Sequence, residues 1–227
     1  MNEDLSTERT RLRREHQKGR YDRANLYAVL DSTPLCHVGY VVDGQPFVTP
    51  TLQWRDGDYI YWHGSSKSRA LKAAVDASVC ITVTRLDGMV LARSAYHHSA
   101  NFASAMIFGV AERVEAPDRK KAALRTMVEG LYPGRWEELR PVTAFELKAT
   151  LVLRARLDEA SVKLRQGEVL EEEADADWPV WAGVVPLSID AEAPAPDRRN
   201  RHDLETPQYL RQWKLARPGG ESAPRKR

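Results

Sequence analysis

Apolar residues in the middle of the chain recur at every second position. In residues 36–42, cysteine, valine and tyrosine side chains alternate with other residues, which is the spacing of a β-strand with one buried face. Asp43-Gly44 follows, and Asp-Gly favours the backbone of a tight hairpin turn. With extended segments at 46–52 and 59–63, the pattern predicts three consecutive antiparallel strands.

Further strand-like and helix-like segments follow the hairpins. Asp22 is a candidate N-cap of a first helix, and Pro117 occupies a first-turn position of a later one. We interpret Asp87-Gly88 as a turn between two strands. Mostly consecutive strands with few helices predict a mainly β fold, an antiparallel barrel that is closed or nearly closed. The expected strands are 36–42, 46–52, 59–63, 79–85, 89–92, 105–114 and 150–158, and the expected helices are 22–30, 68–75 and 117–130.

Composition places the chain among globular proteins. A chain of 227 residues with 42% apolar content buries about 70% of its unfolded surface, so one domain with terminal additions is expected. The net charge of +2 and the pI near 8.5 do not indicate a nucleic-acid partner. Cys36 and Cys80 lie in apolar runs and are expected to be buried thiols, with no metal site.

The sequence predicts no membrane partner and a cytoplasmic location. No apolar run approaches the length of about 18 residues that a membrane span needs. The polar N-terminus also lacks the apolar region of a secretory signal.

The predicted domain occupies residues 21–190. Residues 1–20 form a basic N-terminal arm that we interpret as solvated, with a nucleic-acid-binding arm as the alternative. Residues 191–227 form a C-terminal extension that begins with a proline-containing linker. We expect residues 217–227 to be disordered, whereas the aromatic side chains of 207–213 could dock on the domain.

A segment rich in serine and cations lies where the third strand ends and a helix begins. Gly64 allows the backbone to approach a ligand closely, and Ser66 is the expected N-cap. Lys67 and Arg69 lie in the first turn, where cations oppose the helix dipole at roughly 0.3–1 kcal/mol each. A bound anion would explain both cations; the alternative is an exposed polar loop. The spacing is not that of a P-loop.

Two other segments are candidate ligand contacts. The adjacent His97 and His98 would face opposite sides of a strand, so we do not expect them to hold one metal ion. We therefore interpret the segment around them either as a loop that lines a pocket or as plain surface. Pro50 cannot donate to a sheet ladder, which predicts a bent or edge strand. The unpaired backbone groups of such a strand could bind a ligand. The alternative is an ordinary edge strand without a ligand.

A series of short blocks covers residues 20–187. The blocks are Tyr21-Asp22-Arg23, Cys36-His37-Val38-Gly39-Tyr40, Pro50-Thr51-Leu52, Tyr61-Trp62-His63-Gly64-Ser65 with Lys67, Ser68 and Arg69, Leu91 to Ser99, Phe108-Gly109-Val110-Ala111, Pro133-Gly134-Arg135-Trp136, and Val180 to Leu187. In this order they resemble the FMN-binding split-barrel family related to pyridoxamine 5'-phosphate oxidase, especially its flavin-nucleotide-binding and nitroimidazole-reductase branch. The resemblance implies a six-stranded antiparallel split β-barrel with flanking helices, and a homodimer with FMN at its interface.

The resemblance also implies where FMN is bound. The phosphate would lie at residues 63–69, the isoalloxazine edge would follow the backbone of 50–52, and residues 97–104 would complete the site, from the same or the second subunit. Trp181 would cover the flavin or pack the dimer. His37 is the candidate catalytic acid or base, with a hydrogen-bonded core histidine as the alternative. The implied cofactor-binding residues are Pro50, Thr51, Leu52, His63, Ser65, Ser66, Lys67, Arg69, His97, His98, Ser99, Ser104 and Trp181.

The function that the resemblance implies is an FMN-dependent oxidoreductase acting on a small molecule. Phe102-Ala103-Ser104 stands where relatives have Tyr-Arg-Ser, so an arginine is missing. The C-terminal pattern that binds the substrate phosphate in vitamin B6 oxidation is also not found. The alternatives are a flavin carrier or sensor without turnover, and a split barrel that has lost FMN or binds another cofactor such as haem.

Overall fold

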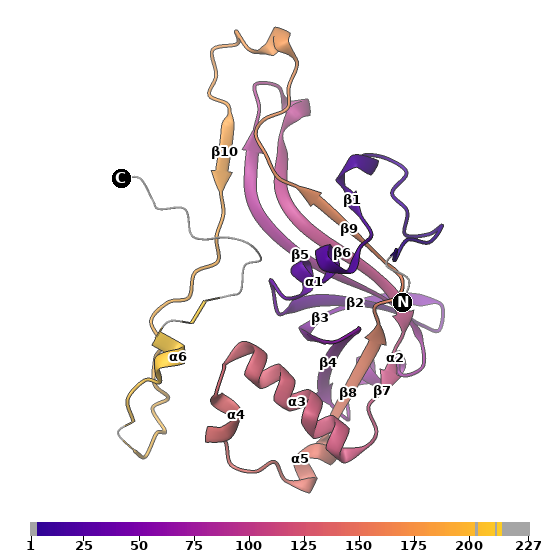
Figure 1. Ribbon diagram of the computed structural model, residues 1–227, viewed down its shortest axis with the longest axis vertical. Helices are drawn as coiled ribbons and strands as arrows, with labels where there is room; N and C mark the ends of the chain where they lie inside the picture. Colours follow the sequence, from indigo (N-terminus) through magenta and orange to yellow (C-terminus); the bar gives the residue numbers. More distant parts are fainter. Residues whose placement is uncertain (1–3, 203, 212, 215–227) are drawn as a thin grey trace.

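A curled antiparallel sheet dominates the computed structural model, which describes residues 4–202, 204–211, 213 and 214 (Figure 1). The ten-stranded sheet has the order β1-β9-β6-β5-β2-β3-β4-β8-β7, with β10 paired to β5. The strands are β1 (Gly19–Arg20), β2 (Leu35–Val42), β3 (Gln45–Asp56), β4 (Tyr59–Ser65), β5 (Ser78–Leu91), β6 (Ser99–Val110), β7 (Glu112–Arg113), β8 (Thr150–Arg156), β9 (Ala160–Arg165) and β10 (Gly183–Pro186). The α-helices are α1 (Arg23–Leu30), α2 (Arg69–Ala74), α3 (Pro117–Leu131), α4 (Arg135–Glu138), α5 (Ala144–Ala149) and α6 (Gln208–Arg211).

The architecture confirms the predicted mainly β split barrel with flanking helices. The six strands that the resemblance implies, like the seven expected from the pattern, are too few for the sheet as a whole, because short or late strands extend it at both edges and beside β5. None of the described helices is both long and apolar enough to cross a membrane.

The sheet divides within β3. Up to Leu52, which lies opposite Leu35, β3 pairs with β2. From Gln53 onward it pairs with β4. Pro50 therefore lies where β3 has a neighbour on one side, as predicted for a strand edge, because proline lacks the N–H that a second ladder would need.

The inner face of the sheet forms the main hydrophobic core. Cys36, Val38 and Tyr40 of β2 are buried, as the alternating pattern predicts. Burial raises the pKa of the Cys36 thiol to about 12. The second cysteine, Cys80, is only half-buried, so the prediction of two buried thiols is correct for Cys36 alone.

The predicted helix boundaries are close to those of the structure. Asp22 caps α1 by accepting a hydrogen bond from the Asn25 amide at 2.9 Å, and Pro117 opens α3. α3 lies against the far side of β3 and β4, where a second core cluster includes Trp54 and Tyr61. This packing leaves the two faces of β3 in different surroundings.

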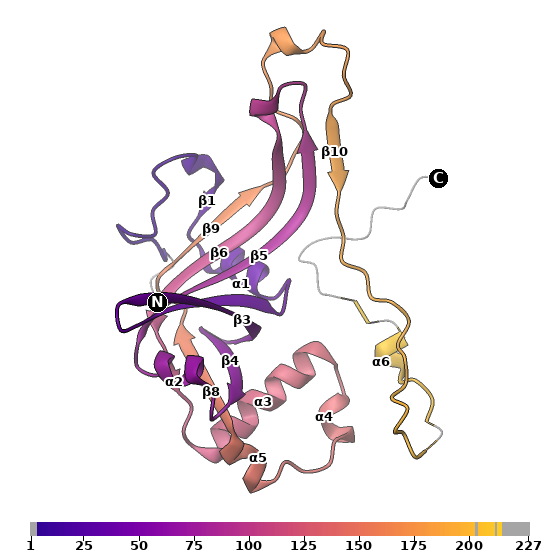
Figure 2. The same ribbon diagram turned by 180° about the vertical axis from the view of Figure 1, so that it is seen from behind.

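The predicted turn at Asp87-Gly88 is wrong. β5 continues through it, with an irregular register between Leu86 and Gly88. A Cβ atom at Gly88 would lie 3.1 Å from the Val185 carbonyl oxygen of β10, so the glycine serves close strand pairing rather than a turn. β5 and β6 therefore form one long hairpin that extends from the body beside β10 (Figures 1 and 2). We call its outer part, residues 86–102, the arm.

The sequence prediction also missed β9. This strand pairs with β6 along six positions, from Phe102 opposite Arg165 to Ile107 opposite Ala160. Ala160 and Val162 are each 1% exposed. In the sequence these apolar residues alternate with polar ones, which indicates a strand. The last strand predicted from the sequence nevertheless ended at Asp158.

Both terminal segments pack on the domain. Leu5 is 2% exposed and accepts a hydrogen bond from the Ala160 amide at 3.0 Å, so the N-terminal segment is not simply solvated. In the C-terminal extension, Trp213 Nε1 donates to the Leu131 carbonyl at 2.6 Å, as the interpretation of a docking aromatic segment anticipates. The residues expected to be disordered, 217–227, lie outside the described part of the chain.

Candidate functional site

The predicted anion-binding segment lies at the junction of β4 and α2. Ser68 is the N-cap of α2, because its hydroxyl accepts from the Leu71 amide at 3.3 Å; the prediction of Ser66 as the cap is wrong. The backbone amide of Ser66 instead donates a hydrogen bond of 2.7 Å to the Ala149 carbonyl oxygen at the end of α5. Ser65 accepts from the Lys67 amide at 3.2 Å. These bonds hold the segment in a defined conformation.

Gly64 makes room for α2, a role that the sequence did not indicate. A Cβ atom here would lie 2.9 Å from Leu71 Cδ1, which is closer than carbon atoms pack. Leu71 is 8% exposed and belongs to the main core. The glycine therefore lets α2 lie directly on the end of β4.

Two cations at this junction have no carboxylate partner. Within the described residues, Lys67 and Arg69 take part in no ion pair, and both are exposed. The Arg69 guanidinium lies over the Phe47 ring at 5.7 Å from its centroid. α2 has only six residues, so the helix dipole contributes little, and the side-chain cations are the groups that can bind an anion.

A small cavity of about 110 Å³ opens beside the junction, between β2, β3, β4 and α2. Thr51, His63 and Ser65, all predicted site residues, line this junction cavity together with the Tyr40 ring. Tyr40 and Thr49 share a hydrogen bond between their hydroxyl groups at 3.2 Å. Ligand pockets are typically about 300–1,000 Å³, so the junction cavity suits a phosphate-sized group and not a flavin ring.

His63 lies between the junction and the α3 side of the sheet. Its ring meets Trp54 edge to face, with centroids 5.7 Å apart. Its Nδ1 atom is buried and has no hydrogen-bond partner among the described residues. Burial lowers the pKa of His63, because an imidazolium loses hydration there. At neutral pH the ring is uncharged and offers an unused nitrogen.

The segment 50–52 is divided between two faces of the sheet. Thr51 faces inward to the junction cavity, whereas Pro50 and Leu52 are exposed. Pro50 lies opposite His37 on β2, and His37 lies opposite Thr82 on β5. His37 is exposed, so the alternative of a core histidine is wrong.

The arm carries the other predicted histidines. His97 Nδ1 lies 2.9 Å from the Ser94 hydroxyl and 3.7 Å from an Asp175 carboxylate oxygen. His98 Nδ1 contacts the Ser94 carbonyl oxygen at 2.9 Å. Ser99 begins β6. This arrangement engages one nitrogen of each imidazole.

Of the remaining predicted residues, Ser104 lies on β6 and Trp181 lies just before β10. Ser104 lies opposite Thr84 of β5. Trp181 is 64% exposed and its indole covers Gly183, where a Cβ atom would lie 2.8 Å from the ring. The arm points away from α2 (Figures 1 and 2), so one chain does not bring residues 97–99 and Trp181 together with residues 63–69.

The outer face of the sheet is apolar and uncovered. We use this name for the side of β2, β3, β5 and β6 on which His37 lies. Large apolar side chains on it are 42–68% exposed. They are Leu35, Val41, Val48, Leu52, Met106 and Val110. This face was not predicted from the sequence, although apolar residues on both faces of β2 indicate it.

A sequence model described as pyridoxamine 5'-phosphate oxidase matches residues 22–164, which is more than half of the chain. This chain belongs to the pyridoxamine 5'-phosphate oxidase family. The part that matches this family includes the junction of β4 and α2 and the arm. β10, Trp181 and the C-terminal extension lie outside it.

Two solved structures resemble this chain over more of its length than the family model matches. The flavocytochrome Anf3 from Azotobacter vinelandii is 46% identical, covers 94% of this chain and 100% of its own, and has a TM-score of 0.89. The FAD and heme binding protein from Mycobacterium smegmatis is 36% identical over 87% of this chain and 98% of its own, with a TM-score of 0.83. A Bacteroides thetaiotaomicron protein assigned to 5-nitroimidazole antibiotic resistance covers 64% of this chain and 85% of its own at 21% identity and a TM-score of 0.52, a likeness of fold alone. No match was found among curated proteins.

Proposed function

We propose that this chain is a flavin-binding redox protein that holds haem as a second cofactor. The observation that carries the proposal is the 46% identity with flavocytochrome Anf3 over 94% of the chain. The second relative, named for FAD and haem, supports the same pair of cofactors at 36% identity. Both likenesses extend well beyond the part of the chain that matches the family model.

The unpaired cations at the β4–α2 junction support a flavin phosphate there. We propose that Ser65, Ser66, Lys67 and Arg69 hold it, with His63 alongside, since charge-assisted hydrogen bonds are the strongest available to an anion. FMN, the cofactor predicted from the sequence, and FAD share this phosphate. The relative named for FAD favours FAD as the alternative.

The flavin ring needs a different surface from the junction cavity, which is too small for it. We propose that the ring lies against the outer face, along Pro50 and Leu52 and near His37. A bound flavin supplies the redox chemistry, and the protein orients it and excludes water. His37, exposed opposite Pro50, is the candidate proton donor or acceptor for a small-molecule substrate.

The donor chemistry also fits haem, because imidazole is a common axial ligand. His97 has one nitrogen held by Ser94 and near Asp175, the arrangement that usually orients a metal-ligating histidine. His63 lies beside the proposed phosphate site, and its Nδ1 atom is buried, so it is kept for the flavin and not for the haem. We propose His97 as the candidate haem ligand.

We propose a homodimer, formed through the outer face, as the functional unit. Monomeric proteins rarely expose a contiguous apolar patch of this kind, and the six apolar side chains lie on neighbouring strands. A second copy could also bring its arm and Trp181 to the residues 63–69 that its own chain leaves apart from them. The predicted residues His98 and Ser99 on that arm, and Ser104 on β6 of the same copy, would then complete the flavin site across the interface.

The proposal is tested by the cofactors that copurify with the full-length protein. We expect flavin and haem absorption in the same preparation, and mass spectrometry of the released flavin separates FMN from FAD. Anaerobic bleaching of the flavin by NAD(P)H, followed by reoxidation with turnover of an acceptor, indicates an oxidoreductase. A flavin that is bound but not reduced indicates the carrier or sensor. A colourless protein that takes up neither cofactor would overturn the proposal.

A further inference from the structure

A row of aromatic rings crosses the paired strands β3 and β4 on the side that faces α3. Trp54 and Tyr61 lie directly opposite each other in the β3–β4 register, and their rings stack with centroids 5.6 Å apart and planes inclined at 15°. Tyr59 lies two residues before Tyr61 on β4, and the centroids of these two rings are 6.2 Å apart. We call these three residues the aromatic row.

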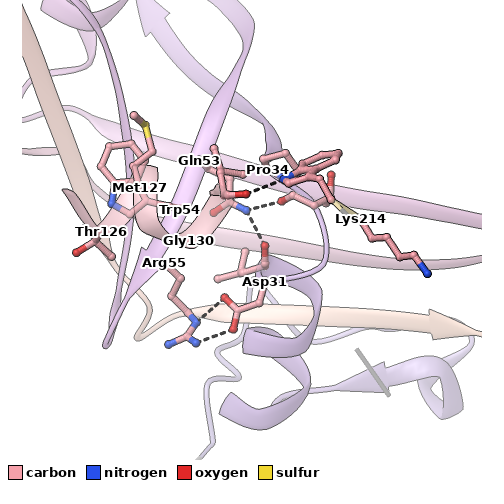
Figure 3. Close-up of a pocket in the computed structure, with 13 residues that line it drawn as sticks. Asp31, Pro34, Gln53, Trp54, Arg55, Thr126, Met127, Gly130 and Lys214 are labelled. Carbon is pink, nitrogen blue, oxygen red and sulfur yellow. Dashed lines mark hydrogen bonds and ion pairs between the residues drawn. The ribbon is translucent and has the colours of Figure 1, made fainter. Parts of the chain in front are cut away.

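The aromatic row runs from the protein interior toward the surface. Trp54 and Tyr61 are each 7% exposed. Met127 of α3 packs against their cluster, and Figure 3 shows it beside the Trp54 ring. Tyr59 is half-buried, and its hydroxyl oxygen accepts a hydrogen bond from Arg156 Nη1 at 3.2 Å in an exposed position. That bond does not use the phenolic proton of Tyr59, which therefore remains available to water.

The interior end of the row lies next to the surface on which the flavin ring is proposed to bind. Leu52 and Trp54 are two residues apart on β3, so their side chains leave the strand on the same side, with Cα atoms roughly 6.4–6.8 Å apart. Leu52 is 45% exposed on the outer face, whereas Trp54 is covered by α3. Electron transfer between rings requires proximity and not an open pocket. A flavin ring along Leu52 is therefore within reach of Trp54.

The surroundings of Trp54 suit a transient electron donor. Tryptophan and tyrosine are among the side chains that lose a single electron most readily. A flavin in its ground state does not oxidise them, whereas a flavin excited by blue light does. Trp54 Nε1 is buried and has no hydrogen-bond partner among the described residues, so an oxidised indole has no base to which it can release its proton. Such a ring remains a strong oxidant and takes an electron from the stacked Tyr61.

Charges around Tyr59 determine how the row ends. The guanidinium groups of Arg154 and Arg156 lie over the Tyr59 ring, at 4.1 and 5.2 Å from its centroid. Each is paired with a carboxylate, Arg154 with Glu112 and Arg156 with Asp158. Nearby cations disfavour a positively charged ring, so the oxidation of Tyr59 is completed by loss of its phenolic proton, which leaves a neutral radical.

We propose that the aromatic row carries electrons from the protein surface to the bound flavin when blue light excites it. Trp54 gives one electron to the excited flavin and regains one from Tyr61. Tyr61 regains an electron from Tyr59, which releases its phenolic proton to water. A thiol in solution restores Tyr59 by supplying one electron and one proton, and two of the resulting thiyl radicals combine as a disulfide. This light-driven reduction rests on the proposed function, because it requires the bound flavin.

Transient absorption of the unaltered, flavin-loaded protein tests the path without any substitution. After a short blue pulse we expect the absorption of an indole radical, followed by that of a tyrosyl radical as the first one decays. Bound flavin with neither radical overturns the proposal. A protein that takes up no flavin overturns the proposed function and the path with it, so the two failures are distinguishable.

Two variants separate the first electron transfer from the later ones. Trp54→Phe retains an aromatic ring that the flavin does not oxidise, and we expect the fluorescence lifetime of the bound flavin to be several-fold longer. In Tyr61→Phe the lifetime should stay short, because Trp54 is still present. The yield of lasting flavin reduction in the presence of a thiol should nevertheless fall several-fold, because the electron returns to Trp54. A change in packing alone would not divide the two measurements in this way.

Matched substitutions outside the row are the controls. Trp136→Phe, on α4, and Tyr132→Phe, at the end of α3, should match the unaltered protein in both measurements. An unchanged lifetime in flavin-loaded Trp54→Phe, or an unchanged yield in flavin-loaded Tyr61→Phe, overturns the assignment of the path to these residues.

Discussion

His63 and Trp54 meet edge to face, with ring centroids 5.7 Å apart and ring planes inclined at 65°. They come from the paired strands β4 and β3. His63 lines the junction cavity and Trp54 belongs to the core cluster under α3, and each ring has a buried nitrogen without a partner among the described residues. The contact therefore joins the proposed phosphate site to the core cluster that packs against α3.

The stability of the protein should depend on pH through His63. Burial lowers its folded-state pKa below the ordinary value of 6.5. Between these two values the unfolded chain binds more protons than the folded one, so the free energy of unfolding should fall as pH falls through 6.5. In His63→Gln this contribution is absent, and its melting temperature should decrease less steeply on acidification. His202→Gln, at an exposed position, is the control; equal slopes for His63→Gln and the unaltered protein would contradict the prediction.

Lys67 and Arg69 should dominate flavin affinity. Replacing both with alanine removes charge-assisted hydrogen bonds to the phosphate, and we expect a loss of roughly 2–4 kcal/mol in binding free energy after allowing for exposure. Fluorescence titration of the apoprotein with FMN and with FAD measures it. In the control variant, two other exposed lysines, Lys72 and Lys121, are replaced with alanine. This variant should bind flavin with nearly unchanged affinity. Unaltered affinity in the first variant would mean that the phosphate is held elsewhere.

Lys120 should be important for stability. It is 6% exposed, and its Nζ group donates to the carbonyl oxygens of Leu147 and Thr150, each at 2.9 Å, at the end of α5. Lys120→Met leaves both carbonyls without this donor, which should lower the free energy of unfolding by roughly 1–3 kcal/mol. Urea denaturation followed by circular dichroism measures the change. Lys121→Met, on the exposed side of α3, should be near neutral, and a similar loss in both variants would argue against a specific role for Lys120.

The outer face should determine the oligomeric state. Val41 and Val48 on it are 58% and 68% exposed, and charging both with aspartate should convert a dimer to a monomer, because the carboxylates would be buried without partners. Light scattering coupled to gel filtration gives the mass. Leu204→Asp, at a residue that is 73% exposed in the C-terminal extension, should remain dimeric. A dimer that survives both aspartates would place the interface on another surface.

Local patterns predicted much of the fold and part of the site. The alternation along β2, the Asp22 cap, the Pro117 helix start and the strand edge at Pro50 all depend on neighbouring residues, so they can be recognised without the rest of the chain. The junction segment with Lys67 and Arg69 was also found in this way. Its N-cap was assigned two residues too early, because several serines there satisfy the same rule.

Long-range contacts decided the rest. Asp87-Gly88 has the local chemistry of a turn, yet β10, from a distant part of the sequence, packs on Gly88 and keeps β5 extended. The separation of residues 97–99 from residues 63–69 follows from the direction of the arm, which no local spacing specifies.

Alternation along the chain thus determined which segments are strands and which of their faces are buried, because side-chain direction repeats every two residues. Only the tertiary structure decided which strands pair, where β3 changes partners, and that the arm carries residues 97–99 away from residues 63–69. Those features depend on contacts between residues far apart in sequence, whose free energy is realised only when the whole sheet has formed.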